Sequence, residues 1–146
     1  MSENEIGFSS VASELKEAYR ATHFNVLEPA SFTLRIGSQS RDLSNLYQNY
    51  NISTAAFITA WNPFSNPTPE HENARMQRRL EKRLHELSIA FFPGMGEDPS
   101  GEWPGEPSVL ALGVSREAAI GLGREFRQNA IVWIDADCIP DLLFLR

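Results

Sequence analysis

The sequence has a single cysteine, Cys138, and no hydrophobic run near the ~18 residues that a membrane-spanning helix needs. One cysteine cannot form a disulfide within the chain, and it cannot hold a zinc ion without several other ligands. Basic residues are few, because 13 Lys and Arg stand against 19 Asp and Glu, for a formal net charge of -6. This balance argues against a general surface for nucleic acid or for anionic membranes.

The first five residues, MSENE, are acidic and polar, which is the opposite of the basic start and apolar middle of a signal peptide. With no export signal and no disulfide framework, we expect a cytoplasmic protein. The 146 residues are 42% hydrophobic, enough for one sizeable core. We therefore expect a flexible N-terminus at residues 1–8 and a single globular domain at residues 9–146.

Apolar spacing predicts an alternation of helices and strands. The clearest helix begins near Pro69 and ends near Leu87, with an inner stripe that includes Leu80 and Leu84. We expect other helices at residues 9–22, after Ser40 and at 115–126, and strands at 32–36, 55–61, 89–93, 109–114, 130–134 and 142–145.

Residues 54–134 therefore run β-α-β-β-α-β, the order of a ferredoxin-like unit. We predict an α+β fold in which a mixed sheet is flanked by helices, with an additional helix and strand at the N-terminus. A three-layer α/β sheet is the main alternative.

Polar residues interrupt this pattern near Asn62. A buried strand ends in Trp61 and Asn62, and Pro63 forces Asn62 out of helical geometry. In the next helix, the apolar residues that face the core recur every three or four positions. The same spacing, continued towards the start of the helix, places Asn73 on the buried face of the first turn. Strand ends that open into loops are common ligand sites, so Trp61, Asn62 and Asn73 are candidate binding residues. The alternative is structural: Trp61 packs, Asn62 forms hydrogen bonds within the turn, and Asn73 holds the proline-rich loop in place.

A second group of polar residues lies just before two later strands. Glu106 and Ser108 lead into an apolar strand, and Gln128 precedes another. A partly buried Glu106 must find a partner or become protonated, and a carboxyl group with a raised pKa is suited to acid–base catalysis. The alternative is a solvated glutamate in a rigid turn. Arg75, two residues after Asn73, is a further candidate for contact with an anion.

Other signals are weaker. The arginines and lysine at residues 75–83 lie among glutamates, which indicates a solvated helix face rather than a nucleic-acid groove. His71 and His85 do not have the spacing of a helical metal-binding pair, so we predict no metal site. No motif for a cofactor or for a specific reaction is present, and the sequence leaves the oligomeric state open.

Four strings of residues resemble an uncharacterised bacterial family, the domain of unknown function DUF3293: Thr59-Ala60-Trp61-Asn62-Pro63, Glu72-Asn73-Ala74, Glu106-Pro107-Ser108 and Gln128–Trp133. Tyr19 and Thr22 resemble the family's N-terminal Tyr-x-x-Thr-x-Tyr element. Phe24 replaces its last tyrosine, so no hydroxyl role transfers to that position. The resemblance implies a small bacterial or phage-borne cytosolic protein, and it implies no reaction.

These residues lead to two hypotheses. In the first, the side chains of Trp61, Asn62, Asn73, Glu106, Ser108 and Gln128 line a pocket for a small polar ligand such as a nucleotide or sugar derivative. Glu106 would be the general base if the protein is an enzyme, for example a hydrolase of glycosidic or phosphate-linked bonds. In the second, the acidic surface and an exposed Trp103 bind a protein partner, as an adaptor or inhibitor does.

Overall fold

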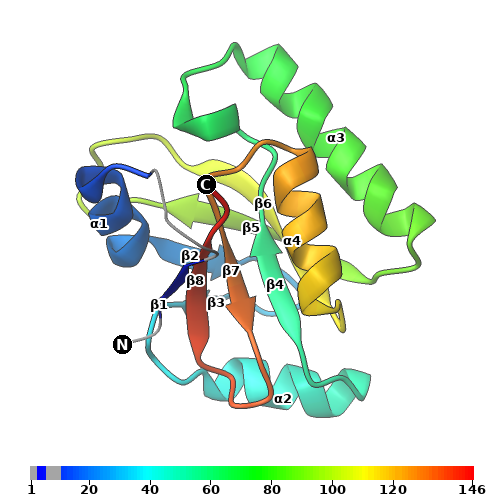
Figure 1. Ribbon diagram of the computed structural model, residues 1–146. Helices are drawn as coiled ribbons and strands as arrows, with labels where there is room; N and C mark the ends of the chain where they lie inside the picture. Colours follow the sequence, from blue (N-terminus) through cyan, green and yellow to red (C-terminus); the bar gives the residue numbers. More distant parts are fainter. Residues whose placement is uncertain (1–2, 6–10) are drawn as a thin grey trace.

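The computed structural model describes residues 3–5 and 11–146, which form four α-helices and one sheet of eight strands (Figure 1). The helices are α1 (Ser13–Ala21), α2 (Arg41–Tyr50), α3 (Glu70–Glu86) and α4 (Arg116–Glu125). The strands are β1 (Glu3–Glu5), β2 (His23–Val26), β3 (Phe32–Leu34), β4 (Ala55–Ile58), β5 (Phe91–Glu97), β6 (Glu106–Leu112), β7 (Ala130–Ile134) and β8 (Pro140–Phe144). No helix in this described part is long and apolar enough to cross a membrane.

The strands lie in the order β1-β8-β7-β4-β6-β5-β2-β3. Each pair of neighbours is antiparallel except β1 and β8, which run parallel. The central four strands, β7-β4-β6-β5, come from the stretch predicted to run β-α-β-β-α-β. The predicted mixed α+β architecture is therefore confirmed.

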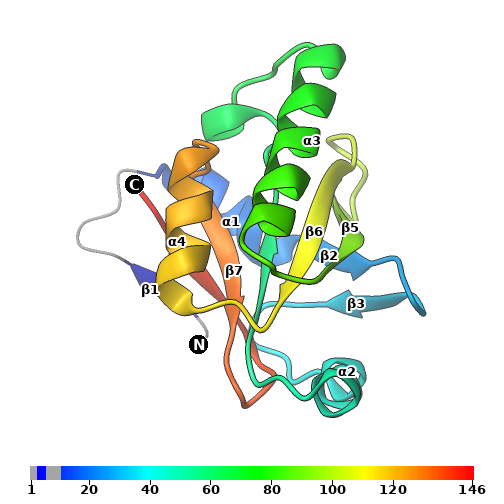
Figure 2. The same cartoon turned by 90° about the vertical axis from the view of Figure 1, so that its right-hand side faces the viewer.

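Helices cover both faces of the sheet (Figure 2). The buried strand β4 contributes to the core on both faces of the sheet, because alternate residues along a strand point to opposite faces. Ala55 and Phe57 join the core cluster beneath α1 and α2. Ala56 and Ile58 join the cluster beneath α3 and α4. The continuous apolar run in the sequence reflects this double burial.

Several boundaries differ from the predictions. The first helix was predicted to begin at residue 9, where Ser9 or Ser10 could cap it, but these two residues lie outside the described part. The helix begins at Ser13 after the N-cap Ala12, which makes no side-chain capping bond. The segment expected to be a flexible N-terminus includes β1, whose polar sequence gives no apolar signal. The remainder of residues 1–8 lies outside the described part.

Two strands are new or longer than expected. Strand β2 was not predicted, although its residues alternate between half-buried and buried. Strand β5 continues through Gly94 and Gly96, where the Gly/Pro content suggested a loop. Residues 94–97 of β5 pair with β2 on one side, and residues 94–96 pair with the start of β6 on the other. Such long-range pairing leaves little trace in local sequence.

Candidate functional site

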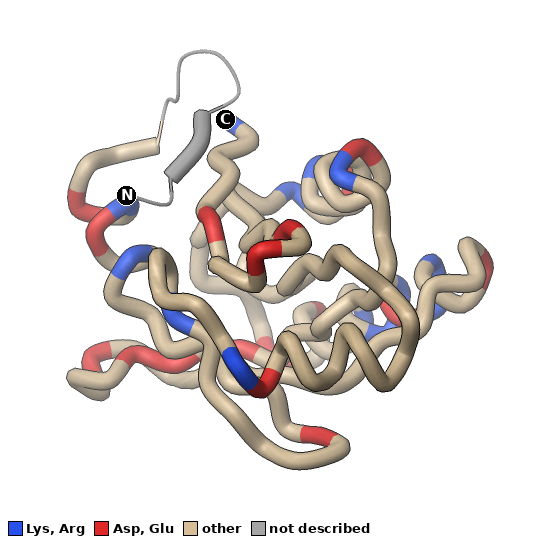
Figure 3. The backbone as a smooth tube through the Cα atoms, turned by 90° about the horizontal axis from the view of Figure 1, so that it is seen from below, with Lys and Arg blue, Asp and Glu red and all other residues tan. Residues whose placement is uncertain are grey.

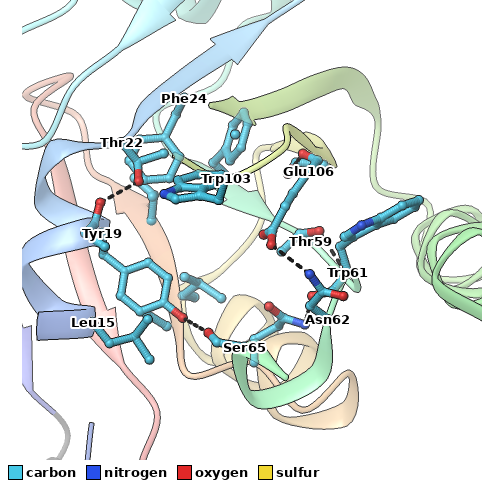
Figure 4. A pocket seen from close by; sticks show the side chains of 18 of the residues that line it. Leu15, Tyr19, Thr22, Phe24, Thr59, Trp61, Asn62, Ser65, Trp103 and Glu106 are labelled. Atoms are coloured by element: carbon cyan, nitrogen blue, oxygen red, sulfur yellow. Dashed lines mark hydrogen bonds between the residues drawn. The ribbon is translucent and has the colours of Figure 1, made fainter. Parts of the chain in front are cut away.

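A cavity of about 360 Å³ lies between α1 and the sheet, where β4 ends and where β6 and β7 begin (Figure 4). Its lining residues come from α1, from six strands and from the loops after β4, before β6 and before β7. They are Leu15, Ala18, Tyr19, Thr22, Phe24, Phe57, Thr59, Trp61, Asn62, Ser65, Pro67, Gly96, Trp103, Pro104, Glu106, Ser108, Gln128, Ala130, Ile131, Val132 and Leu142.

The loop after β4 is held by Asn73. The side-chain oxygen of Asn73 accepts a hydrogen bond from the Asn62 main-chain N–H at 2.8 Å, and its amide nitrogen donates to the Asn62 side-chain oxygen at 2.8 Å and to Thr68 O at 3.2 Å. Asn62 has φ +46°, an uncommon left-handed conformation that asparagine tolerates better than most residues. Asn73 is 1% exposed and does not line the cavity. It is a positioning residue for Asn62.

Glu106, the first residue of β6, lies next to Asn62 in the cavity wall. Figure 4 shows its carboxylate directed towards Asn62, whose side-chain amide donates to Glu106 Oε2 at 3.3 Å. Burial raises the pKa of Glu106, and the bond from Asn62 opposes part of this rise. The structure therefore brings Asn62, Asn73 and Glu106 together from three distant segments.

The α1 side of the cavity carries a pair of hydroxyl groups. Tyr19 Oη lies 2.8 Å from Ser65 Oγ, and the side-chain amide of Asn129 donates to Ser65 Oγ at 3.1 Å. Arg146 in turn donates to Asn129 Oδ1 at 3.2 Å. Burial raises the pKa of Tyr19, so its hydroxyl stays protonated at neutral pH.

The two tryptophans that line the cavity, Trp61 and Trp103, have different positions. Figure 4 shows the indole of Trp61, which we expected to stack on a ligand, pointing away from Tyr19 on the opposite side of the cavity. The indole of Trp103 instead lies among the lining side chains, and Trp103 is half-buried. Of the two indoles, that of Trp103 is therefore the one that lies among the other lining side chains.

The other predicted residues divide between lining and solvent. Ser108 and Gln128 are buried and line the cavity, but their side chains donate to main-chain oxygens, Ser108 to Glu106 O and Gln128 to Trp61 O. Arg75 is exposed on α3 and does not line the cavity. Two residues turn an α-helix by about 200°, so Arg75 faces away from the side on which Asn73 is buried.

The residues that motif reading missed belong to the α1 wall. Ser65 received no role, and Tyr19 and Thr22 entered only through the family resemblance. The sequence gives little indication that these residues line a cavity, because Tyr19 lies at the border of the apolar face of an ordinary amphipathic helix. Its contact with Ser65 joins residues 46 positions apart.

A family model described as "Protein of unknown function (DUF3293)" matches residues 58–131, just over half of the chain. The chain belongs to this family. The matched stretch of this DUF3293 member includes Asn62, Asn73, Glu106 and Gln128, whereas Tyr19 lies outside it. No curated protein and no solved structure matches the chain.

Charged residues of both signs are interspersed over the molecule (Figure 3). Arg83 on α3, within the basic stretch of the sequence, lies 3.3 Å from Glu86 and 3.0 Å from Glu125. Among the residues that the structure describes, no group of three His, Cys, Asp or Glu side chains is placed to hold a metal ion.

Replacement of Glu106 by glutamine should stabilise the protein at neutral pH. The unfolded chain loses this proton at about pH 4.3, whereas the folded chain holds it to higher pH. Stability therefore falls as pH rises through the folded pKa. We expect Glu106→Gln to raise the Tm at pH 7 and to have no such effect at about pH 4 or below.

Thermal unfolding between pH 4 and pH 8 measures this difference. Glu102→Gln is the matched control, because Glu102 is exposed in the loop before β6. A Glu106→Gln variant that is less stable than the wild type at pH 7 contradicts the assignment of Glu106 as a desolvated carboxylate.

Proposed function

We propose that the cavity beneath α1 binds a small, uncharged or cationic organic ligand, and that Glu106 is the main polar contact. The observation that carries this proposal is a half-buried carboxylate at the wall of a largely apolar cavity, with a raised pKa and one long hydrogen bond from Asn62. A desolvated charge of this kind destabilises the folded protein, and a ligand that donates hydrogen bonds to it compensates the loss. The volume of about 360 Å³ is at the lower end of the range for small-molecule sites.

The charges of the lining favour this ligand class over a phosphorylated one. Among the lining residues that the structure describes, Glu106 is the one carboxylate, and none is a lysine, arginine or histidine. A phosphate group would meet no cationic partner there and would be repelled by ionised Glu106. We therefore infer that a nucleoside or a sugar is favoured over its phosphorylated form.

The position of Trp103 favours a ligand site over a protein adaptor. An adaptor role would be supported by a Trp103 that protrudes into solvent with no cavity beside it. Trp103 is instead half-buried and lines the cavity. Aromatic faces of this kind contribute apolar contact area to small-molecule sites.

A thermal-shift screen tests the proposal. The panel contains nucleosides, sugars and small amines, together with the phosphorylated form of each nucleoside and sugar. A true ligand at a hundred times its Kd should stabilise the protein by about 2.7 kcal/mol, or by roughly 5–10 °C in Tm. The phosphorylated counterpart should give no shift.

Glu106→Gln should strongly reduce the shift while keeping the fold, and Glu102→Gln should leave the shift unchanged. If the ligand is also hydrolysed, Glu106 is the candidate general base and the same substitution should abolish turnover. A screen in which no compound shifts the wild-type Tm contradicts the proposal.

We also infer that β4–β7, together with α3 and α4, form a ferredoxin-like unit. Its strand order β7-β4-β6-β5, with antiparallel neighbours, supports this assignment. Bacterial origin and cytoplasmic location stay predictions from the sequence.

A further inference from the structure

Most polar side chains of the cavity wall have no proton to offer a ligand. Four of them already donate to main-chain carbonyl oxygens, those of Thr22, Thr59, Ser108 and Gln128. Thr59 Oγ1 also accepts from the Trp61 main-chain N–H at 3.0 Å. Apart from the indole N–H groups of Trp61 and Trp103, the side-chain protons available to a ligand are therefore concentrated at two places.

The first place is formed by Glu106 and Asn62. An ionised carboxylate accepts at about four sites on its two oxygens. The Asn62 amide occupies one of these, on Oε2, and no residue in the described part of the chain donates to Oε1. The Asn62 amide has two protons and uses one for Glu106, so one donor stands next to several acceptor sites.

The second place is the hydroxyl pair on the α1 side. Tyr19 and Ser65 have two hydroxyl protons between them, and one of these lies in the 2.8 Å hydrogen bond that joins the two oxygens. Asn129 donates to Ser65 and so takes up no hydroxyl proton. The second hydroxyl proton has no acceptor among the described residues and is available to a ligand.

The remaining wall is mainly apolar and includes aromatic rings, among them Phe24, Phe57 and Trp103, whose indole also carries one N–H group. A sugar places hydroxyl groups around its whole ring, and most of these would be buried without a partner here. A flat heterocycle has apolar faces and polar edges, which matches a wall with two separated polar places.

We propose that the cavity binds a guanine-type heterocycle, whose carbonyl oxygen faces the Asn62 amide and whose two neighbouring N–H groups face the Glu106 carboxylate. This inference rests on the proposed function and names the ligand class of the same site. Two parallel N–H to carboxylate bonds are charge-assisted and specific in geometry. The hydroxyl pair of Tyr19 and Ser65 then donates to an acceptor elsewhere on the ligand.

Isothermal titration calorimetry with guanosine, inosine and adenosine tests this assignment. Inosine lacks the amino group and loses one charge-assisted bond, so guanosine should bind at least tenfold more tightly. Adenosine should show no detectable binding, because its edge directs a ring-nitrogen lone pair at the carboxylate. Guanosine monophosphate should bind more weakly than guanosine.

Three variants separate the contacts. Glu106→Gln should reduce guanosine binding to the level of inosine or below, and the matched control Glu102→Gln should leave both affinities unchanged. Tyr19→Phe should weaken guanosine and inosine by the same factor, so that their ratio persists. Stronger binding of adenosine or of a sugar than of guanosine overturns the guanine assignment and leaves the proposed function standing. Absence of binding by any compound at millimolar concentration overturns both.

Discussion

Asn73→Leu will lower the free energy of unfolding by about 3 kcal/mol and will abolish ligand-induced stabilisation. The amide of Asn73 makes three hydrogen bonds to the loop after β4, two of them to Asn62 and one to Thr68 O. Leucine fills similar space but leaves those loop groups without a partner, at about 1–3 kcal/mol for each one that stays buried. The loop then no longer holds Asn62 against Glu106.

Urea unfolding and the thermal-shift assay measure the two effects separately. His71→Leu is the control, because His71 is exposed in the same first turn of α3. It should change the unfolding free energy by less than about 0.5 kcal/mol. A loss below 1 kcal/mol for Asn73→Leu, or an unchanged ligand shift, shows that Asn73 does not hold the loop.

The orientation of Asn73 and its contact with the proline-rich loop could be predicted from sequence, whereas the individual groups that it bonds could not. The spacing of apolar residues in α3 fixes which side of the helix is buried, and Asn73 falls on that side. Its partner depends on the loop backbone, where Asn62, Phe64 and Ser65 all have positive φ values. Contacts with Tyr19, Asn73 and Asn129 hold this unusual conformation, and no local sequence pattern encodes them.

The same distinction applies to the fold. Strand β7 was predicted with its observed bounds, and Ser40 and Ser115 cap α2 and α4 as their sequence context suggests. These features depend on neighbouring residues. Strand β2 and the second half of β5 depend instead on each other, because each supplies the other's hydrogen bonds. Tyr19 was likewise not predicted as a cavity residue, because the cavity exists only once α1 packs on the sheet.

The cavity wall also depends on a tight contact between Gly94 and Phe57. A Cβ at Gly94 would lie 2.6 Å from Phe57 Cε2 and 3.0 Å from Asn25 O. The Phe57 ring packs edge-on against Phe24, with centroids 5.3 Å apart, and it lines the cavity. We expect Gly94→Ala to cost about 2 kcal/mol of stability, because overpacking moves the ring. Displacement of the ring into the cavity should also weaken ligand binding.

A double-mutant cycle isolates this contact. Phe57→Ala alone should cost about 3–5 kcal/mol, since the ring is 4% exposed. In that background Gly94→Ala meets no ring and should cost at least 1 kcal/mol less than in the wild type, a coupling of the size expected for residues in contact. Gly96→Ala, two positions along the same strand, is the matched control, because its Cβ would have no neighbour closer than 3.9 Å. Additive losses would mean that the cost of Gly94→Ala comes from the Asn25 carbonyl rather than from the ring, and the cavity would then keep its shape in the Gly94→Ala variant.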